Sequence, residues 1–171
     1  MLFRSTDHDK VKGLLTELLT LRDDDHETRK SLVEQIRDAL IPHSRAEESV
    51  FYNSLRTIKN AKDEAMHGYK EHMEAETLLR ILQVEDKTHM DWKETASKLK
   101  EALEHHIQEE ETTMFNLARA NFTAEEAQQM GAAFEKLKPE IKEQTIVGTT
   151  WDMVANLMPT RFSNNFRDMR P

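Results

Sequence analysis

A histidine followed four positions later by a glutamate recurs along this chain at spacings of 29 and 34 residues, and another histidine lies 35 residues before the first pair. Residues four apart on an α-helix leave the same face, so each histidine and its glutamate can approach one point. The spacing suits four helices that bring these side chains to a similar depth. The pattern predicts a metal site built across four helices, with the candidate ligands His8, His43, Glu47, His72, Glu76, His106 and Glu110.

The rest of the sequence favours helices throughout. Apolar residues recur every three or four positions, as on the buried stripe of a helix, and the candidate ligands take stripe positions; Leu99 and Leu103, for example, precede His106. Only four glycines and four prolines interrupt the 171 residues, and no run of alternating β-branched residues indicates a strand. We therefore predict an all-α protein, an up-down-up-down four-helix bundle with an additional C-terminal helix and tail.

Local signals set the expected helix boundaries. The first helix is expected to end near residues 23–25 and the third near residues 85–88, and Pro42 is expected to bend the second helix beside His43. Thr123 and Glu126 form a capping box that opens a fifth helix running to about Lys138. We divide the chain into a metal-binding bundle at 1–120 and a C-terminal helix and amphipathic tail at 121–171.

The tail over residues 145–171 carries little charge until its end, and its apolar residues are expected to pack on the bundle or on a second copy of the chain. The chain has no cysteine, which excludes disulfides and thiolate ligands. Its net charge of −8 disfavours nucleic acid as a partner and favours cations. No signal segment opens the chain, and no apolar run approaches the roughly 18 residues of a membrane span. A cytoplasmic protein without a membrane partner is expected.

The residue types of the site indicate its chemistry. Neutral imidazole and carboxylate oxygen suit iron, manganese or zinc, and a carboxylate can bridge two neighbouring cations. Four histidines and three glutamates exceed the needs of one tetrahedral zinc. They fit two cations with room for an exogenous ligand, and burying three carboxylates without cations would cost several kcal/mol each. Metal binding should therefore stabilise the fold.

A metal-free structural bundle is the alternative. One HxxxE pair is nearly uninformative in so Glu-rich a chain, and His26, His67, His89 and His105 illustrate that background. Four helices that each place a histidine on the apolar stripe, three of them with a glutamate four positions later, are much harder to produce by chance. A ferritin-like di-iron protein would carry glutamate three positions ahead of histidine, the reverse of the order here. Tyr69, one turn before His72, is expected to pack with its hydroxyl hydrogen-bonded rather than to act as a redox partner.

In helix count, motif order and spacing, residues 5–120 resemble hemerythrin-like proteins with the HHE cation-binding domain. The resemblance implies a non-haem di-iron centre, with two iron ions joined by an oxo or hydroxo bridge, although manganese or zinc also suit the ligands. It implies that His8, His43, His72 and His106 are the imidazole ligands, that Glu47 and Glu110 bridge the ions, and that Glu76 is a terminal ligand.

Two departures separate this chain from the oxygen-carrying members of the family. Those proteins have a second histidine where this chain has Glu76, and an aspartate five positions after the last histidine, where this chain has Glu110 at four. An additional anionic ligand favours ferric iron, which argues against reversible O2 transport. We expect a protein that binds O2, NO or peroxide for sensing, storage or protection. The alternative is an enzyme that reduces peroxide or oxidises ferrous iron.

Overall fold

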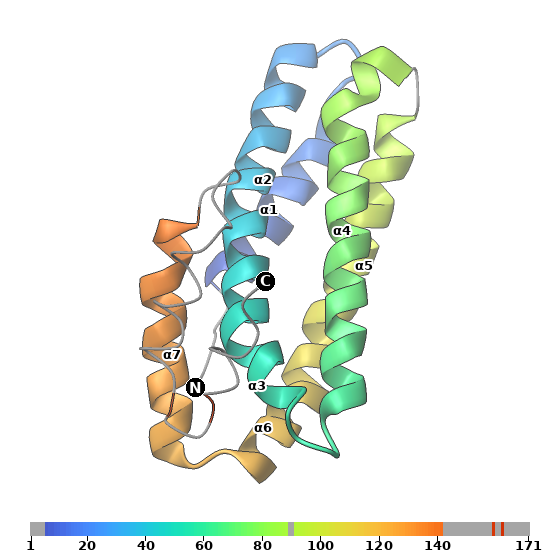
Figure 1. The fold of residues 1–171 in the computed structure, drawn as a ribbon. Coiled ribbons are helices and arrows are strands. Elements are labelled where there is room, and N and C mark those ends of the chain that lie inside the picture. Colours follow the sequence, from blue (N-terminus) through green and yellow to red (C-terminus); the bar gives the residue numbers. More distant parts are fainter. Residues whose placement is uncertain (1–5, 89–90, 142–158, 160–161, 163–171) are drawn as a thin grey trace.

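The computed structural model describes residues 6–88, 91–141, 159 and 162, and within them it contains helices and no strand (Figure 1). Four long helices form a bundle and a fifth lies against it. The prediction of an all-α bundle with an additional C-terminal helix is therefore confirmed. These helices are α1 (Thr6–Thr20), α2 (His26–Glu47), α4 (Lys62–Thr88), α5 (Trp92–Glu109) and α7 (Ala124–Leu137).

Two of the bundle helices continue into wider turns. A π-helical segment, η1 (Glu48–Tyr52), follows α2 and leads into α3 (Asn53–Leu55). A second π-helical segment, η2 (Glu110–Met114), follows α5 and leads into α6 (Phe115–Asn121). Such segments are rare and occur mostly at functional sites, where they shift the direction of side chains. Here they begin beside or at the predicted bridging carboxylates Glu47 and Glu110.

Most helix boundaries agree with their local signals, although α1 ends at Thr20, before the end predicted near residues 23–25. The Asp25 and Asp91 side chains accept hydrogen bonds from backbone N–H groups in the first turns of α2 and α5. The predicted capping box is present, since Thr123 Oγ1 accepts from the Glu126 N–H at 3.2 Å and Glu126 Oε2 accepts from the Thr123 N–H at 2.9 Å. Pro42 lies within α2, and a 3-10 turn, η3 (Lys138–Glu140), follows α7.

The apolar core is divided into two clusters by a polar layer. One cluster includes Leu15, Ile36 and Leu99, and the other includes Phe51 and Met114. Along α2, the first cluster ends at Leu40 and the second begins at Ala46. The same change lies between Ala75 and Ala65 on α4, and between Leu103 of α5 and Met114 of η2. Six of the seven candidate ligands, all except Glu76, lie in the intervening layer, where apolar side chains on both sides keep out water.

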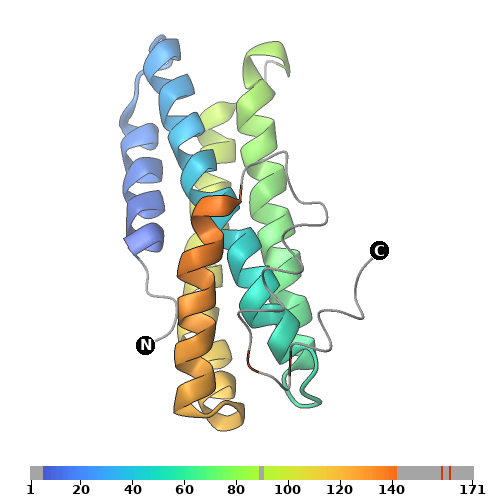
Figure 2. The same ribbon diagram turned by 60° about the vertical axis from the view of Figure 1, so that its left-hand side comes forward.

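The C-terminal helix packs on the bundle. Met130, Phe134 and Leu137 of α7 belong to the second apolar cluster, and Figure 2 shows α7 running beside α2. Phe162 is also buried there, with its ring centroid 5.5 Å from that of Phe122. Apart from residues 159 and 162, the predicted tail at 145–171 lies outside the described residues, so its role in self-association stays a prediction. None of the described helices is long and apolar enough to cross a membrane.

Candidate metal centre

Four buried imidazoles meet in the polar layer. The Nε2 atoms of His8 on α1 and His43 on α2 are 2.9 Å apart, and those of His72 on α4 and His106 on α5 are 3.1 Å apart. No more than 7% of any of the four residues is exposed. Four helices thus each contribute one imidazole, arranged as two pairs, to the centre of the bundle.

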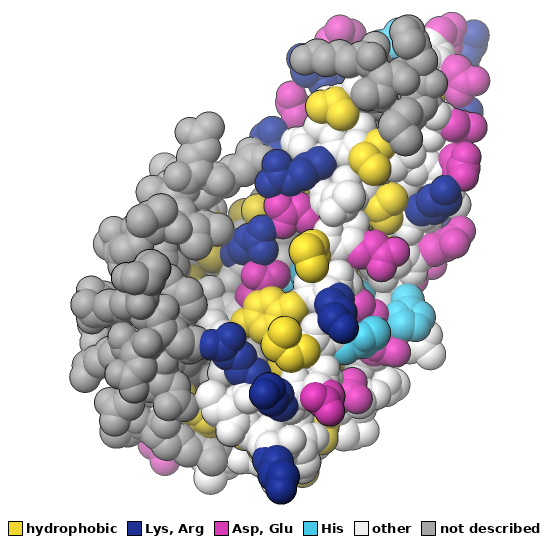
Figure 3. Space-filling model, turned by 45° about the vertical axis from the view of Figure 1, so that its right-hand side comes forward, with side chains coloured by type: hydrophobic (Ala, Val, Ile, Leu, Met, Phe, Trp, Pro, Cys, Tyr) yellow, Lys and Arg dark blue, Asp and Glu magenta, His cyan; other side chains and the backbone are white. Residues whose placement is uncertain are grey.

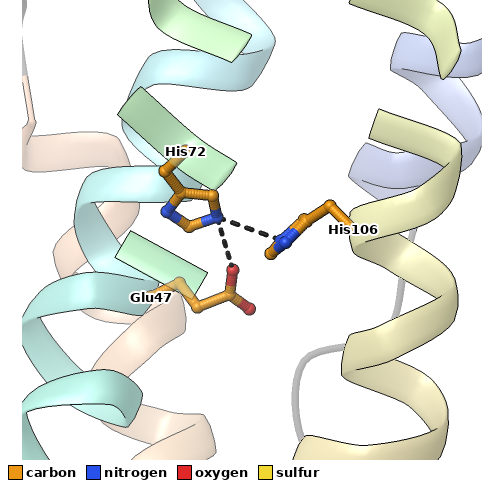
Figure 4. Close-up of side chains that lie close together, drawn as sticks. All are labelled: Glu47, His72 and His106. Carbon is orange, nitrogen blue, oxygen red and sulfur yellow. Dashed lines mark hydrogen bonds and ion pairs between the residues drawn. The ribbon is translucent and has the colours of Figure 1, made fainter. Parts of the chain in front are cut away.

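Two glutamates lie among these imidazoles. Glu47 Oε2 is 3.4 Å from His72 Nε2 and 3.7 Å from His43 Nε2, and Glu110 Oε2 is 3.7 Å from His8 Nε2. Glu47, His72 and His106 each direct one ligand atom to a common space, with these atoms within 4.8 Å of one another (Figure 4). Glu47 therefore reaches both imidazole pairs, as a bridging carboxylate must.

The carboxylates fit a cation because they have no other adequate partner. Glu47 and Glu110 are both 0% exposed, and none of their four oxygen atoms accepts a hydrogen bond. Burial raises the pKa of Glu47, but the neighbouring His43 and His72 outweigh burial and hold this pKa well below its usual value. Burial and the charge of Glu47 raise the pKa of Glu110 well above its usual value. Cations between these groups would remove the cost of burying both charges.

Three of the four imidazoles contact a supporting carboxylate through their Nδ1 atoms. His43 Nδ1 is 3.1 Å from Asp7 Oδ2, His72 Nδ1 is 3.1 Å from Glu48 Oε1, and His106 Nδ1 is 2.9 Å from Glu71 Oε2. A hydrogen bond donated by Nδ1 leaves the lone pair on Nε2 free for a metal and fixes the ring orientation. In contrast, His8 Nδ1 is buried without a hydrogen-bond partner.

No sequence motif pointed to Asp7, Glu48 or Glu71 as supports of the centre. Each of them is adjacent in sequence to a candidate ligand: Asp7 precedes His8, Glu48 follows Glu47, and Glu71 precedes His72. Adjacent helical residues diverge by about 100°, so each support reaches a ligand on a neighbouring helix rather than its own neighbour. This adjacency is the signal that could have identified them.

The C-terminal region contributes to this supporting layer. Lys138 Nζ donates a hydrogen bond to Asp7 Oδ2 at 2.8 Å, and the Phe134 ring meets the edge of His43 with centroids 5.3 Å apart. The hydrogen bond with His43 is the largest cause that holds the pKa of Asp7 well below its usual range. Residues from α7 and η3 therefore help to fix a histidine of α2.

The environments of the imidazoles differ in their preference for a proton. Burial is the main reason that the pKa of His8 falls to about 4, and burial likewise lowers the pKa of His106. Burial also disfavours charged His72, but its contacts with Glu47 and Glu48 outweigh that effect and raise its pKa to about 9. In the metal-free protein, His72 thus carries a proton near neutral pH.

Glu76 is not brought together with the other six predicted ligands. Its carboxylate accepts a close hydrogen bond from Arg45 Nη2 and another from Arg80 Nη2 at 2.7 Å. Arg45 approaches from α2, whereas Arg80 lies one turn further along α4. Two guanidinium groups thus satisfy this carboxylate outside the cluster, and the predicted terminal ligand is engaged in a surface ion pair.

Tyr52, which no sequence signal singled out, lies beside the centre. It is 0% exposed, and its hydroxyl oxygen is 3.4 Å from His106 Nε2. Its ring centroid is 5.2 Å from that of His72, and burial raises the pKa of its hydroxyl well above the usual value. Tyr69 instead donates a hydrogen bond to Asn53 Oδ1 at 2.8 Å, as expected of a packed tyrosine.

Comparison with known proteins agrees with this geometry. The sequence model of the hemerythrin HHE cation binding domain matches residues 5–118. A protein named DNA nickase from Nostoc sp. (strain PCC 7120 / SAG 25.82 / UTEX 2576) is 28% identical over 138 residues, which are 81% of this chain. The alignment covers 38% of that relative, so this chain spans well under half of its length.

Proposed function

Because this chain belongs to the hemerythrin HHE cation-binding family, we propose that its buried centre holds two iron ions and binds a small ligand such as O2, NO or peroxide. The observation that carries the proposal is the set of four carboxylate oxygens, buried without hydrogen bonds and surrounded by four imidazole Nε2 atoms. Buried polar atoms in native proteins nearly always have partners, and cations suit this donor set.

The two imidazole pairs suggest how the ions would be held. His8 and His43 would bind one ion, His72 and His106 the other, and Glu47 and Glu110 would bridge them. Two divalent cations offset the two carboxylate charges and leave positive charge for an anionic ligand. Bound iron supplies one-electron redox chemistry and open coordination positions for the small ligand.

The protein's own residues give this centre its character. The apolar clusters on either side exclude bulk water. The Tyr52 hydroxyl keeps its proton because of its raised pKa, so it can donate a hydrogen bond beside His106. A ligand bound on this side would meet a protonated phenol in buried surroundings.

Sensing, storage or protection fits these surroundings better than reversible O2 transport. Glu76 occupies the position of a histidine in the oxygen carriers and is engaged by Arg45, so the pair of His72 and His106 lacks a third imidazole. Glu48 and Glu71 make these two imidazoles more basic, which favours ferric iron. We therefore expect the ferrous protein to oxidise quickly in air.

The direct test is to load the full chain with ferrous iron under anaerobic conditions. We expect about two iron ions per chain by elemental analysis, a rise in melting temperature, and a near-ultraviolet charge-transfer band after oxidation. Less than one ion per chain with no rise in melting temperature would contradict the di-iron centre. A complex with O2 that persists for hours in air would contradict the argument against transport.

An enzyme is the second candidate, and Tyr52 is the observation that favours it. A phenol beside the centre can deliver a proton to reduced peroxide. Steady turnover of hydrogen peroxide by the iron-loaded chain, lost in Tyr52→Phe, would establish this alternative. The nickase activity in the relative's name is not part of the proposal, because a net charge of −8 opposes binding to DNA.

A further inference from the structure

Two further HxxxE pairs face each other outside the buried centre. His67 and Glu71 lie four residues apart on α4, and His105 and Glu109 lie four residues apart on α5. His67 Nε2 is 3.0 Å from Glu109 Oε2 and 3.6 Å from Glu71 Oε1. His105 Nδ1 is 3.0 Å from Glu71 Oε1, and its Nε2 is 3.6 Å from Glu109 Oε1. Each carboxylate therefore meets both histidines.

This cluster reaches the solvent through its two histidines, unlike the buried centre. The imidazoles of His67 and His105 are 48% and 62% exposed, while the carboxylates of Glu71 and Glu109 are 12% and 34% exposed. Figure 3 shows histidine and acidic side chains next to each other on one side of the surface. A hydrated cation could reach this cluster without any movement of the helices.

We propose that His67, Glu71 and Glu109, with His105 beside them, form an outer binding site for one divalent metal cation such as Zn²⁺. Ligand atoms about 2.0–2.1 Å from a tetrahedral cation are about 3.3 Å from one another. His67 Nε2 lies 3.6 Å from Glu71 Oε1 and 3.0 Å from Glu109 Oε2, around that value. His105 meets Glu71 and Glu109 through different ring nitrogens, so one of these nitrogens would turn toward the ion as the fourth ligand. Two imidazoles and two carboxylates also form a neutral complex with a divalent ion.

The charges of the cluster support a cation over a set of ordinary surface ion pairs. Among the described residues, no lysine or arginine side chain pairs with Glu71 or Glu109, although such pairs are frequent elsewhere on the same helices. Both carboxylates instead converge on imidazole nitrogens. His67, Glu71 and Glu109 also present one ligand atom each within 4.8 Å of one another. A divalent ion would supply the charge that the cluster lacks.

Glu71 connects the outer site to the buried centre. Its Oε1 atom faces His67 and His105, while its Oε2 atom is 2.9 Å from Nδ1 of His106. One carboxylate thus separates an exposed cation from a ligand of the centre. If the centre binds metal as proposed above, the outer site would hold a cation from solution next to it. The outer site itself requires only its own four side chains.

The decisive experiment counts Zn²⁺ bound to the full chain, by equilibrium dialysis followed by elemental analysis. The His67→Asn/His105→Asn double variant should bind about one Zn²⁺ fewer per chain than the wild type. His26→Asn, which removes an exposed histidine from the start of α2, is the matched control and should lose none. Equal Zn²⁺ content in the wild type and the double variant would overturn the proposal.

A second pair of variants tests the carboxylates without changing a histidine. Glu109→Gln should weaken the outer Zn²⁺ site at least about tenfold in calorimetric titration, because it removes an anionic ligand. Glu104→Gln removes an exposed carboxylate from the same helix outside the cluster and should leave the affinity unchanged. Identical titrations for both variants would also overturn the proposal. If the buried centre proved empty, the difference of one Zn²⁺ would remain, so the two proposals can fail separately.

Discussion

The two halves of the buried centre contain the same side chains but are supported differently. In the half formed by His72 and His106, both imidazoles contact carboxylates through Nδ1, and Tyr52 lies against both. In the half formed by His8 and His43, only His43 has such a contact. His72 lies in the interior of α4, and His106 lies in the last turn of α5, which continues into η2, whereas His8 lies in the first turn of α1.

This difference predicts unequal affinities for metal. A carboxylate that accepts a hydrogen bond from Nδ1 makes the imidazole more basic and reduces the entropy lost when the metal binds. Removal of such a carboxylate commonly lowers metal affinity by about 10–100-fold. Helix ends also fray more readily than helix interiors. We therefore expect the half formed by His72 and His106 to hold its cation more tightly, and the half formed by His8 and His43 to exchange its cation with solution.

The largest effect is expected where the halves meet. Glu110→Gln removes a carboxylate that lies against His8 and Glu47 and that we propose to bridge the two ions, so it should lower metal affinity more than about 100-fold and abolish the rise in melting temperature with iron. In the metal-free protein, the raised pKa of Glu110 means that the folded state keeps a proton that the unfolded state releases. Below about pH 6.5 the lowered pKa values of His8 and His106 act in the opposite direction, because the unfolded state binds protons that the folded state does not. Above about pH 7 the free energy of unfolding should fall as pH rises; the variant should remove the part of that fall that comes from Glu110, and His72 contributes the rest.

Chemical denaturation of the metal-free wild type and variant across this pH range checks the sign. Above about pH 7 the wild type should lose stability with rising pH, since its folded state keeps protons on Glu110 and His72 that the unfolded state releases. The exposed Glu104→Gln variant controls for the loss of one carboxylate. A wild-type protein that becomes more stable over the same range would contradict the proposed repulsion between Glu47 and Glu110.

A matched pair of variants tests the difference between the halves. Asp7→Asn weakens the support of His43, and Glu48→Gln weakens that of His72. Each should lower the affinity of its own half by about 10–100-fold. Stopped-flow removal of metal by a chelator should show two phases in the wild type. Asp7→Asn should accelerate the fast phase and Glu48→Gln the slow one; acceleration of the same phase by both would refute the assignment.

Sequence periodicity was sufficient for the fold and for most of the cluster. Histidines on the apolar stripes of four helices have few directions available, because each stripe must face the common core. The spacing between His43, His72 and His106 therefore fixed their common depth, and Glu47 and Glu110 followed from the helical repeat. These predictions depended on local geometry alone.

Side-chain pairing across helices could not be predicted in the same way. Glu76 has the same spacing from its histidine as Glu47 and Glu110, yet Arg45 on another helix engages it. His67 and His105 were not predicted to belong to a site, because the contacts between their HxxxE pairs depend on how α4 is rotated against α5. The π-helical turns at Glu48 and Glu110 likewise have no sequence signal. In each example, tertiary packing decides among side chains of equal local propensity.

A glycine in α4 tests the packing of the more strongly supported half. A Cβ atom at Gly68 would lie 2.7 Å from Met114 Cε and 2.8 Å from Tyr52 Cζ, so Gly68→Ala must displace the buried tyrosine ring. We expect a loss of about 1–3 kcal/mol in the free energy of unfolding. Gly13→Ala in α1 meets nothing within 4 Å and should instead gain up to about 1 kcal/mol. Thermal denaturation of both variants measures the difference, and equal changes would contradict the close packing.

The smallest effect is expected from the hydroxyl of Tyr52. Tyr52→Phe keeps the buried ring and removes an oxygen atom that is 3.4 Å from His106 Nε2. Because this contact is long, the free energy of unfolding should change by less than about 1 kcal/mol. Any ligand bound beside His106 would lose a hydrogen-bond donor, so its dissociation rate should rise while that of the metal stays the same. Rapid-mixing measurements of NO release from the iron-loaded protein, with Tyr69→Phe as the control, would detect this change. Equal NO release from the wild type and Tyr52→Phe would show that the Tyr52 hydroxyl does not bind the ligand, and that the half formed by His72 and His106 differs from the other half only through Glu48 and Glu71.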